Sequence, residues 1–229
     1  MSKESEQKHF IEQELKLPLT YPLGQLTQRL EKLARKENDR TFERTVMFDT
    51  QEQQRNQSQV MLSRVDNTSI IPPNNFINGG VISFGSLETF LLILASSGIN
   101  VQELDEKVLL TSQELPKNVM WDTEGCLRYR YFQDPRESRS DIAYKKTLQK
   151  IPVRREIEHE TSVTNPKFFE ELVGNFGYKP FFSYERYRTT WVAQQGTDKA
   201  KVDVDEFSFG NYVEIEGSNH DLLVSTAKK

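Results

Sequence analysis

Charged side chains alternate with other residues along two short segments near the beginning and the end of this sequence. These segments are Glu12-Gln13-Glu14-Leu15-Lys16 and Glu214-Ile215-Glu216. Residues i and i+2 of a β-strand share one face, so each segment carries charge where a core strand would carry apolar side chains. Because Mg²⁺ and Mn²⁺ prefer carboxylate oxygens, Glu12, Glu14, Glu214 and Glu216 are candidate metal ligands. The alternative for each pair is the solvated face of an edge strand.

Basic side chains alternate in the same way in two other segments, Arg128-Tyr129-Arg130 and Arg186-Tyr187-Arg188. Guanidinium groups make planar, bidentate contacts with phosphate oxygens and stay charged when buried. Lys145 adds a point charge of the same sign. These residues are therefore candidates for cradling a triphosphate. The alternative is cross-strand ion pairing with glutamates, and both interpretations hold together in a protein without ligand.

Carboxylates also recur at every second position between residues 154 and 160. Arg154, Glu156, Glu158 and Glu160 share one face of a predicted strand. Three carboxylates in a row repel one another when dry and unpaired, so we expect cations or a metal opposite them. Asp205 shares a face with Asp203, which gives it either a supporting or catalytic role or a position as an exposed aspartate.

Composition excludes several classes of protein. The 229 residues include 34 acidic and 30 basic side chains with a net charge of −4, which argues against a duplex nucleic-acid binder. A single cysteine excludes an intrachain disulfide, and none of the three histidines forms a ligand pair for zinc. No apolar segment follows Met1, and the longest apolar run, 90–95, is too short to cross a bilayer. We therefore expect a cytoplasmic protein with no membrane partner.

The pattern of elements is typical of a mostly β-stranded α+β protein. Alternating residues and turn signals predict strands at 10–17, 42–50, 126–132, 141–146, 154–163, 181–194, 201–207 and 211–216. Helical periodicity and capping residues predict helices at 22–33, 86–97, 165–173 and 220–227. The segment from 60 to 118 is hard to interpret, and 104–110 fits a strand or a helix.

The order of these motifs resembles that of the CYTH superfamily, the triphosphate tunnel metalloenzymes. No single motif is specific, but their order along roughly residues 9–50 and 119–217 is. The resemblance rests on Glu12-x-Glu14-x-Lys16, Phe48-Asp49-Thr50, Leu127-Arg128-Tyr129-Arg130, Tyr144-Lys145, the Arg154–Glu160 strand, Arg186-x-Arg188-x-x-Trp191, Val204-Asp205 and Glu214-Ile215-Glu216.

The resemblance implies an antiparallel barrel of about eight strands that forms a tunnel, with flanking helices, in a single domain of residues 1–229. Residues 51–118 exceed what the family usually has at that point, so we expect them to form an insertion. The resemblance also implies Mg²⁺ or Mn²⁺ as cofactor. The predicted phosphate-binding residues are Lys16, Arg128, Arg130, Lys145, Arg154, Arg186 and Arg188, and the predicted catalytic residues are Lys16, Glu158 and Asp205.

The predicted function is metal-dependent hydrolysis of a small molecule that carries a nucleoside, thiamine or inorganic triphosphate. A class IV adenylyl cyclase, which makes cyclic AMP and diphosphate from ATP, is the first alternative. A non-catalytic polyanion-binding module is the second. The sequence allows a homodimer and a protein partner bound through the insertion, and it contains no residue set that identifies the organic part of the substrate.

Overall fold

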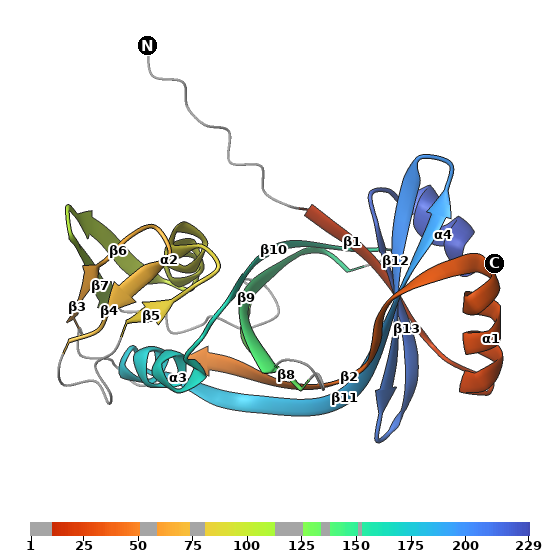
Figure 1. Cartoon of the computed structure of the whole chain (residues 1–229), viewed down its shortest axis with the longest axis horizontal. Coiled ribbons are helices and arrows are strands. Elements are labelled where there is room, and N and C mark those ends of the chain that lie inside the picture. The colour runs from red at the N-terminus through yellow and green to blue at the C-terminus, as the bar shows by residue number, and fades with distance from the viewer. Residues whose placement is uncertain (1–10, 51–58, 74–80, 113–125, 134–137, 151–152) are drawn as a thin grey trace, which may run out of the picture.

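The computed structural model describes residues 11–50, 59–73, 81–112, 126–133, 138–150 and 153–229. Eight antiparallel strands of the described residues close into a barrel (Figure 1), which confirms the predicted α+β class and architecture. In their order around the barrel these strands are β1 (Ile11–Pro18), β10 (Arg154–Ser162), β9 (Ser138–Gln149), β8 (Cys126–Gln133), β2 (Ala34–Thr50), β11 (Tyr178–Gln195), β12 (Asp198–Phe207) and β13 (Gly210–Gly217).

Strand β1 closes the barrel because it has a neighbour on each side. Glu12 lies opposite Glu156 of β10, while Lys16 lies opposite Glu214 of β13. A strand that is paired on both sides leaves no free edge. The alternative interpretation of the Glu12–Lys16 segment as a solvated edge strand is therefore wrong.

Strand β2 begins at Ala34, eight residues before the predicted start at residue 42. Its added segment pairs with the end of β11, where Ala34 lies opposite Ala193 and Lys36 opposite Trp191. The Lys36 ammonium also lies 5.0 Å from the centroid of the Trp191 ring. Residues 34–41 are mostly polar, so tertiary pairing sets their conformation where local β-propensity does not.

The described residues form four helices, and side chains cap the first turn of three of them, two at the predicted capping residues Ser86 and Asn165. The four helices are α1 (Leu23–Leu33), α2 (Leu87–Ser96), α3 (Pro166–Asn175) and α4 (His220–Ala227). The side chains of Ser86, Asn165 and Asn219 accept hydrogen bonds from backbone N–H groups in the first turns of α2, α3 and α4. Leucines of α1 and α4 pack with Trp191 in one apolar cluster on the outside of the barrel.

The segment expected to be an insertion contributes a second sheet. Its five strands, in spatial order, are β5 (Ile82–Ser83), β4 (Ser69–Ile71), β3 (Gln59–Arg64), β7 (Lys107–Ser112) and β6 (Ile99–Leu104). The ambiguous stretch 104–110 is the end of β6, a tight turn at Asp105 with a φ of 40°, and most of β7. Residues 51–58, 74–80 and 113–118 of this segment lie outside the described residues.

A single apolar cluster joins the second sheet to the barrel. Phe90 and Leu94 of α2 belong to the same cluster as Phe169 of α3 and as Phe48 and Tyr129 of the barrel strands. Figure 1 shows the second sheet beside the end of the barrel where α3 lies. The barrel strands thus bury apolar side chains on their outer face, against helices, and keep their inner face free for polar ones.

Phe169 provides a test of this outer core. Its ring lies 5.9 Å from Phe48 and 6.1 Å from Tyr129, measured between ring centroids, and it is fully buried. We expect Phe169→Ala to lower the free energy of unfolding by about 3–5 kcal/mol, because it removes these contacts and leaves a cavity. Urea denaturation measures the change. Val81→Ala, at an exposed position, should change stability by less than about 0.5 kcal/mol; a loss below about 1 kcal/mol for Phe169→Ala would contradict the assignment.

Candidate active site

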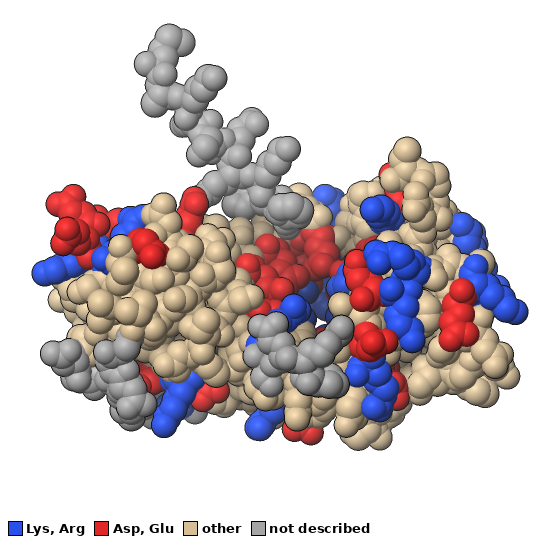
Figure 2. All heavy atoms as spheres, viewed as in Figure 1, with Lys and Arg blue, Asp and Glu red and all other residues tan. Residues whose placement is uncertain are grey.

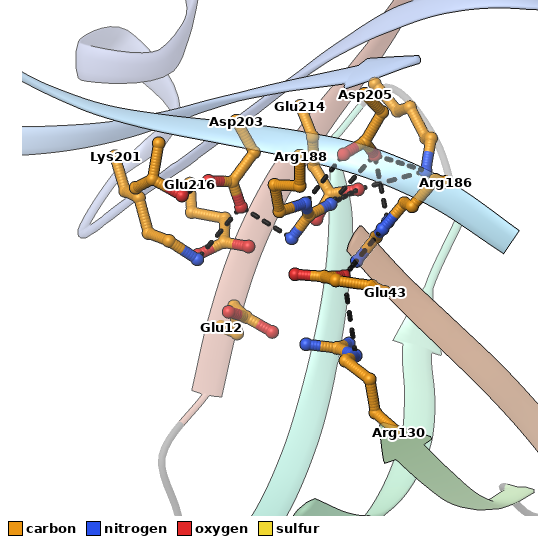
Figure 3. A network of polar contacts seen from close by, with 12 residues as sticks. Glu12, Glu43, Arg130, Arg186, Arg188, Lys201, Asp203, Asp205, Glu214 and Glu216 are labelled. Carbon is orange, nitrogen blue, oxygen red and sulfur yellow. Dashed lines mark hydrogen bonds and ion pairs between the residues drawn. The ribbon is translucent and has the colours of Figure 1, made fainter. Parts of the chain in front are cut away.

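Alternate side chains of the barrel strands point into the barrel, as the spacing of charged residues predicts. Figure 3 shows Arg186 and Arg188, two positions apart on β11, directed toward the same group of carboxylates. The interior holds a cavity of about 630 Å³. The charged residues of its wall are Glu12, Arg35, Glu37, Arg128, Arg130, Lys145, Glu158, Glu160, Arg188, Lys199, Lys201, Glu214 and Glu216.

Two further cavities, of about 440 and 450 Å³, continue this space. Arg130 lines all three cavities, so they are adjoining sections of one bore. Lys16, Arg154 and Arg186 line the section of about 440 Å³. Figure 2 shows acidic and basic side chains side by side in the hollow near the middle of the molecule.

Arg186 and Arg188 anchor the most buried ion pairs of the bore (Figure 3). Arg188 contacts Asp203 and Asp205 at 2.6 Å each and Glu214 at 3.2 Å. Arg186 contacts Glu43 at 2.7 Å and Asp205 at 2.9 Å. Each guanidinium group therefore donates to carboxylates from two or more strands.

Lys145 and Arg128 form a second group of ion pairs with the β10 carboxylates. The Lys145 ammonium lies 2.9 Å from Glu158 and 3.3 Å from Glu12. Arg128 lies 2.8 Å from Glu158 and 3.3 Å from Glu160. The expectation that cations face the row of β10 carboxylates is thus met within the described residues.

Three more cations pair with acidic residues in sections of the bore that are more exposed. Lys16, whose side chain is 39% exposed, lies 3.0 Å from Glu214. The other two contacts are Arg154 with Glu14 at 3.1 Å and Lys201 with Glu216 at 3.1 Å. Six of the seven predicted phosphate-binding residues therefore have close carboxylate partners: Lys16, Arg128, Lys145, Arg154, Arg186 and Arg188. The seventh, Arg130, lies 3.9 Å from Glu43.

Burial and these charges separate the pKa values of neighbouring carboxyl groups. Burial alone would raise the pKa of Glu158, but Lys145 and Arg128 outweigh it and lower that pKa to about 2. Burial raises the pKa of Glu12 to about 8, because Lys145 offsets burial only in part and Glu158 adds to the rise. Carboxylates of one wall thus differ in how readily they give up a proton.

Two groups of carboxylates have the geometry and the chemistry to hold a divalent cation. The groups are Glu12, Glu14 and Glu156, and Glu14, Glu214 and Glu216, and within each the ligand oxygens lie within 4.8 Å of one another. Glu156 Oε2 is buried with no hydrogen-bond partner in the described part of the chain and lies 3.6 Å from the Lys145 ammonium, while Arg154 contacts Oε1 of the same carboxylate at 2.7 Å. Hard carboxylate oxygens without histidine or cysteine suit Mg²⁺ or Mn²⁺.

All four predicted metal ligands therefore lie together, and Glu156 joins them. Asp205 is 0% exposed and both of its oxygens bond to arginines, so the alternative of an exposed aspartate is wrong. This structure uses Asp205 to hold Arg186 and Arg188 in place.

Two residues of the site, Glu43 and Lys201, are absent from the sequence prediction. Strand parity already places Glu156 beside Glu158, facing cations or a metal, and Asp203 beside Asp205, and the same parity with Asp205 also places Lys201. Glu43 had no such signal, because its partners Arg130 and Arg186 come from β8 and β11.

No protein-family model and no curated protein matches this chain significantly. Among solved structures, a "putative adenylate cyclase" of Vibrio parahaemolyticus aligns with 95% of this chain and 87% of its own, at 13% identity and a TM-score of 0.50. The chain has the CYTH fold.

Two further structures align with this CYTH fold at lower TM-scores. The PH1819 protein of Pyrococcus horikoshii OT3 has a TM-score of 0.48 at 12% identity, over 95% of this chain and 84% of its own. HpAC1 of Hippeastrum, a "putative adenylyl cyclase" with a dominant triphosphatase activity, has a TM-score of 0.45 at 14% identity, over 94% and 83%. In the described part of this chain, no helix combines the length and the apolar character needed to span a membrane.

Glu43 provides a test of the ion pairs in this CYTH barrel. Burial would raise the Glu43 pKa, but Arg186 and Arg130 outweigh burial and hold it below its usual value of 4.5. A pKa lowered by folding adds stability above the unfolded value, and this stability is lost as the pH falls through the folded value. We expect Glu43→Gln to cost about 3–5 kcal/mol of unfolding free energy at pH 7, because buried arginines lose a partner.

The difference between Glu43→Gln and the wild type should begin to shrink as the pH falls below about 4.5, where the carboxyl group of the unfolded chain takes up a proton, and should be lost as the pH passes the lower pKa of the folded state. Urea denaturation at pH 7, 5, 4 and 3 measures it. Glu103→Gln is the matched control, because Glu103 pairs with Arg64 at 2.9 Å on the surface and should cost less than about 1 kcal/mol. A difference that stays constant over this pH range would contradict the interpretation.

Proposed function

We propose that this protein hydrolyses a small molecule carrying a triphosphate group, with a divalent metal ion, inside the barrel. One observation carries the proposal: cations from four strands face the same bore as two groups of carboxylates. The cations are Lys16 of β1, Arg128 and Arg130 of β8, Lys145 of β9, and Arg186 and Arg188 of β11. A cavity of about 630 Å³ also has the size typical of small-molecule sites.

The arginines supply the binding chemistry for the phosphates. Arg128 and Arg188 both line the main cavity and present N–H donors in a planar fork, which matches phosphate oxygens. Phosphate oxygens would take the place that Glu158 and Glu214 now hold at these guanidinium groups. The same contacts would stabilise the negative charge that spreads over the phosphoryl oxygens as the bond breaks.

The acidic side of the bore fits the metal. Glu12, Glu14, Glu156, Glu214 and Glu216 would hold Mg²⁺ or Mn²⁺, which would neutralise phosphate oxygens and lower the pKa of a bound water. Lys16 would bind a phosphate oxygen beside this group, since it lies 3.0 Å from Glu214. We assign Glu158 and Asp205 to positioning the cations, because each contacts two of them.

Cyclisation of ATP is the second candidate, because the Vibrio parahaemolyticus structure that shares this fold is described as a "putative adenylate cyclase". In hydrolysis, water attacks the terminal phosphorus, the bond from this phosphorus to the bridging oxygen breaks, and the diphosphate end of the substrate leaves, so that inorganic phosphate and a diphosphate product form. In cyclisation, the ribose hydroxyl attacks the α-phosphorus and diphosphate leaves. The same bore could hold either geometry, so the products decide between them.

Product analysis tests the proposed reaction directly. Purified protein is incubated with tripolyphosphate, ATP or thiamine triphosphate, each with Mg²⁺, with Mn²⁺ or with EDTA. We expect inorganic phosphate to be released with at least one metal and not with EDTA, because the carboxylates need a counter-ion before they can face a triphosphate. Cyclic AMP with diphosphate would instead identify the cyclase. Calorimetric binding without turnover would identify a polyanion-binding module, and the absence of both binding and turnover would refute all three candidates.

Lys16→Ala tests the proposed phosphate contact with little risk to the fold, because this side chain is part-exposed. We expect kcat/KM to fall by about 100-fold, the usual effect of losing one donor that stabilises transition-state charge. Urea denaturation should show a change of less than about 1 kcal/mol. Lys107→Ala, on the exposed end of β7, is the matched control and should leave both values unchanged. Full activity in Lys16→Ala would remove Lys16 from the site.

The buried Arg188 is a poorer choice for this test. It contacts Asp203, Asp205 and Glu214, so Arg188→Ala would leave several carboxylates unpaired inside the barrel. Loss of activity in that variant would therefore not separate a binding role from a structural one.

A further inference from the structure

We propose that a cluster of aromatic rings at one mouth of the bore binds a planar aromatic ring carried by the triphosphate substrate. The inference rests on the proposed function and makes its substrate more specific: a nucleotide or another ring-bearing triphosphate, in preference to inorganic tripolyphosphate. The mouth cluster consists of Phe182, Tyr184, Phe207, Phe209 and Tyr212.

The mouth cluster is continuous from ring to ring. Ring centroids are 5.8 Å apart between Tyr184 and Phe207, 4.9 Å between Phe207 and Phe209, and 5.7 Å between Phe207 and Tyr212. Phe207 and Phe209 are stacked with an angle of 20° between their planes. These residues come from β11, from the end of β12, from the start of β13 and from the tight turn that joins β12 to β13; Figure 1 shows this turn at the lower end of β12 and β13.

This cluster begins inside the phosphate site. Tyr184 lines the section of the bore of about 440 Å³ together with Lys16 and Arg186. The Lys16 ammonium lies 5.7 Å from the centroid of the Phe207 ring. A phosphate held by Lys16 and Arg186 would therefore leave the organic end of the molecule beside Tyr184 and Phe207.

The outer part of the cluster presents unused aromatic surface to solvent. Phe209 is 70% exposed, and Phe182 is exposed as well. Aromatic rings bind other rings by stacking, and they do so without reading a particular base, because every heteroaromatic ring has a π-face. A ring-bearing phosphate needs a positive charge for its phosphate and an aromatic surface for its ring. Lys16 supplies the charge, and Phe207 and Phe209 beside it supply the surface. Inorganic tripolyphosphate would use the charge of Lys16 and make no use of the aromatic surface.

Substitutions at Phe209 test the proposal, because this exposed ring can be removed without opening the core. The measured quantity is the ratio of kcat/KM for ATP, and for thiamine triphosphate, to kcat/KM for tripolyphosphate. We expect the wild type to favour at least one ring-bearing substrate. We expect Phe209→Ala to lower that ratio by about 10-fold through a higher KM, in the range of one base–aromatic stack. Phe209→Trp should retain the ratio, and Phe209→Leu should not.

Leu148→Ala is the matched control, since Leu148 is an exposed apolar side chain on β9 that lines none of the three sections of the bore. Its ratio should equal that of the wild type. A wild type that turns over tripolyphosphate as well as both ring-bearing substrates, or a ratio that Phe209→Ala leaves unchanged, would overturn the inference while the proposed triphosphatase stands. If none of the three compounds is bound or turned over, the proposed triphosphatase function and the ring-binding inference both fail.

Analytical ultracentrifugation of the wild type and Phe209→Ala tests whether a second copy of the chain, and not a substrate, binds to the mouth cluster. The inference predicts that the two proteins sediment alike. A wild-type dimer that Phe209→Ala dissociates, with the substrate ratio unchanged, would assign the mouth cluster to self-association instead.

Discussion

Pairing of opposite charges inside a closed barrel is the interaction on which this structure depends. An ion moved from water into a protein interior costs several kcal/mol unless partners and hydrogen bonds compensate for it. Arg186 and Arg188 are almost completely buried and share Asp205, while Glu43 and Asp203 complete their hydrogen bonds. Closure of the barrel makes this possible, because each arginine finds its partners on other strands. Opening the barrel would expose these ion pairs to water, which weakens the attraction between the charges and removes the strand pairing that holds the partners opposite one another.

An ionic interior cannot supply the apolar burial that stabilises most barrels, so the apolar core lies on the outside. Leucines of α1 and α4 cover one outer region around Trp191. α2, α3 and the second sheet cover another, around Phe169. The same strands therefore bury apolar side chains on their outer face and carry the charged side chains of the bore on their inner face. This division explains why the segment between β2 and β8, whatever else it does, contributes much of the larger apolar cluster.

Much of the candidate site could be predicted from the rule that every second residue of a strand faces the same side. This rule placed Glu12, Glu14, Glu214 and Glu216 on inward faces, and the structure brings them together. Parity could not reveal which strands are neighbours, so the pairing of Glu43 with Arg130 and Arg186 was beyond its reach. The start of β2 was missed because polar residues 34–41 gain their conformation from β11. The second sheet was missed because its short strands, such as β4 and β5, carry too few residues to show a period. The mouth cluster was missed because its rings come from separate strands.

The ion pairs of the bore also determine which charges a ligand would have to displace. On the proposed function, a triphosphate that binds Arg128 or Arg188 would compete with Glu158 or Glu214 for the guanidinium group, and each displaced carboxylate would keep one close cation, Lys145 or Lys16. Freed carboxylates repel one another and the incoming phosphates unless a divalent cation takes the place of the arginines. On the proposed function, metal and triphosphate would therefore favour each other's binding, and linkage would make that coupling equal in both directions. Side chains of opposite charge neutralise one another in this bore, and a metal ion bound together with a triphosphate would preserve that balance of buried charge. On this argument the alternation of acid and base around the barrel would allow one cavity to hold two ligands of opposite charge.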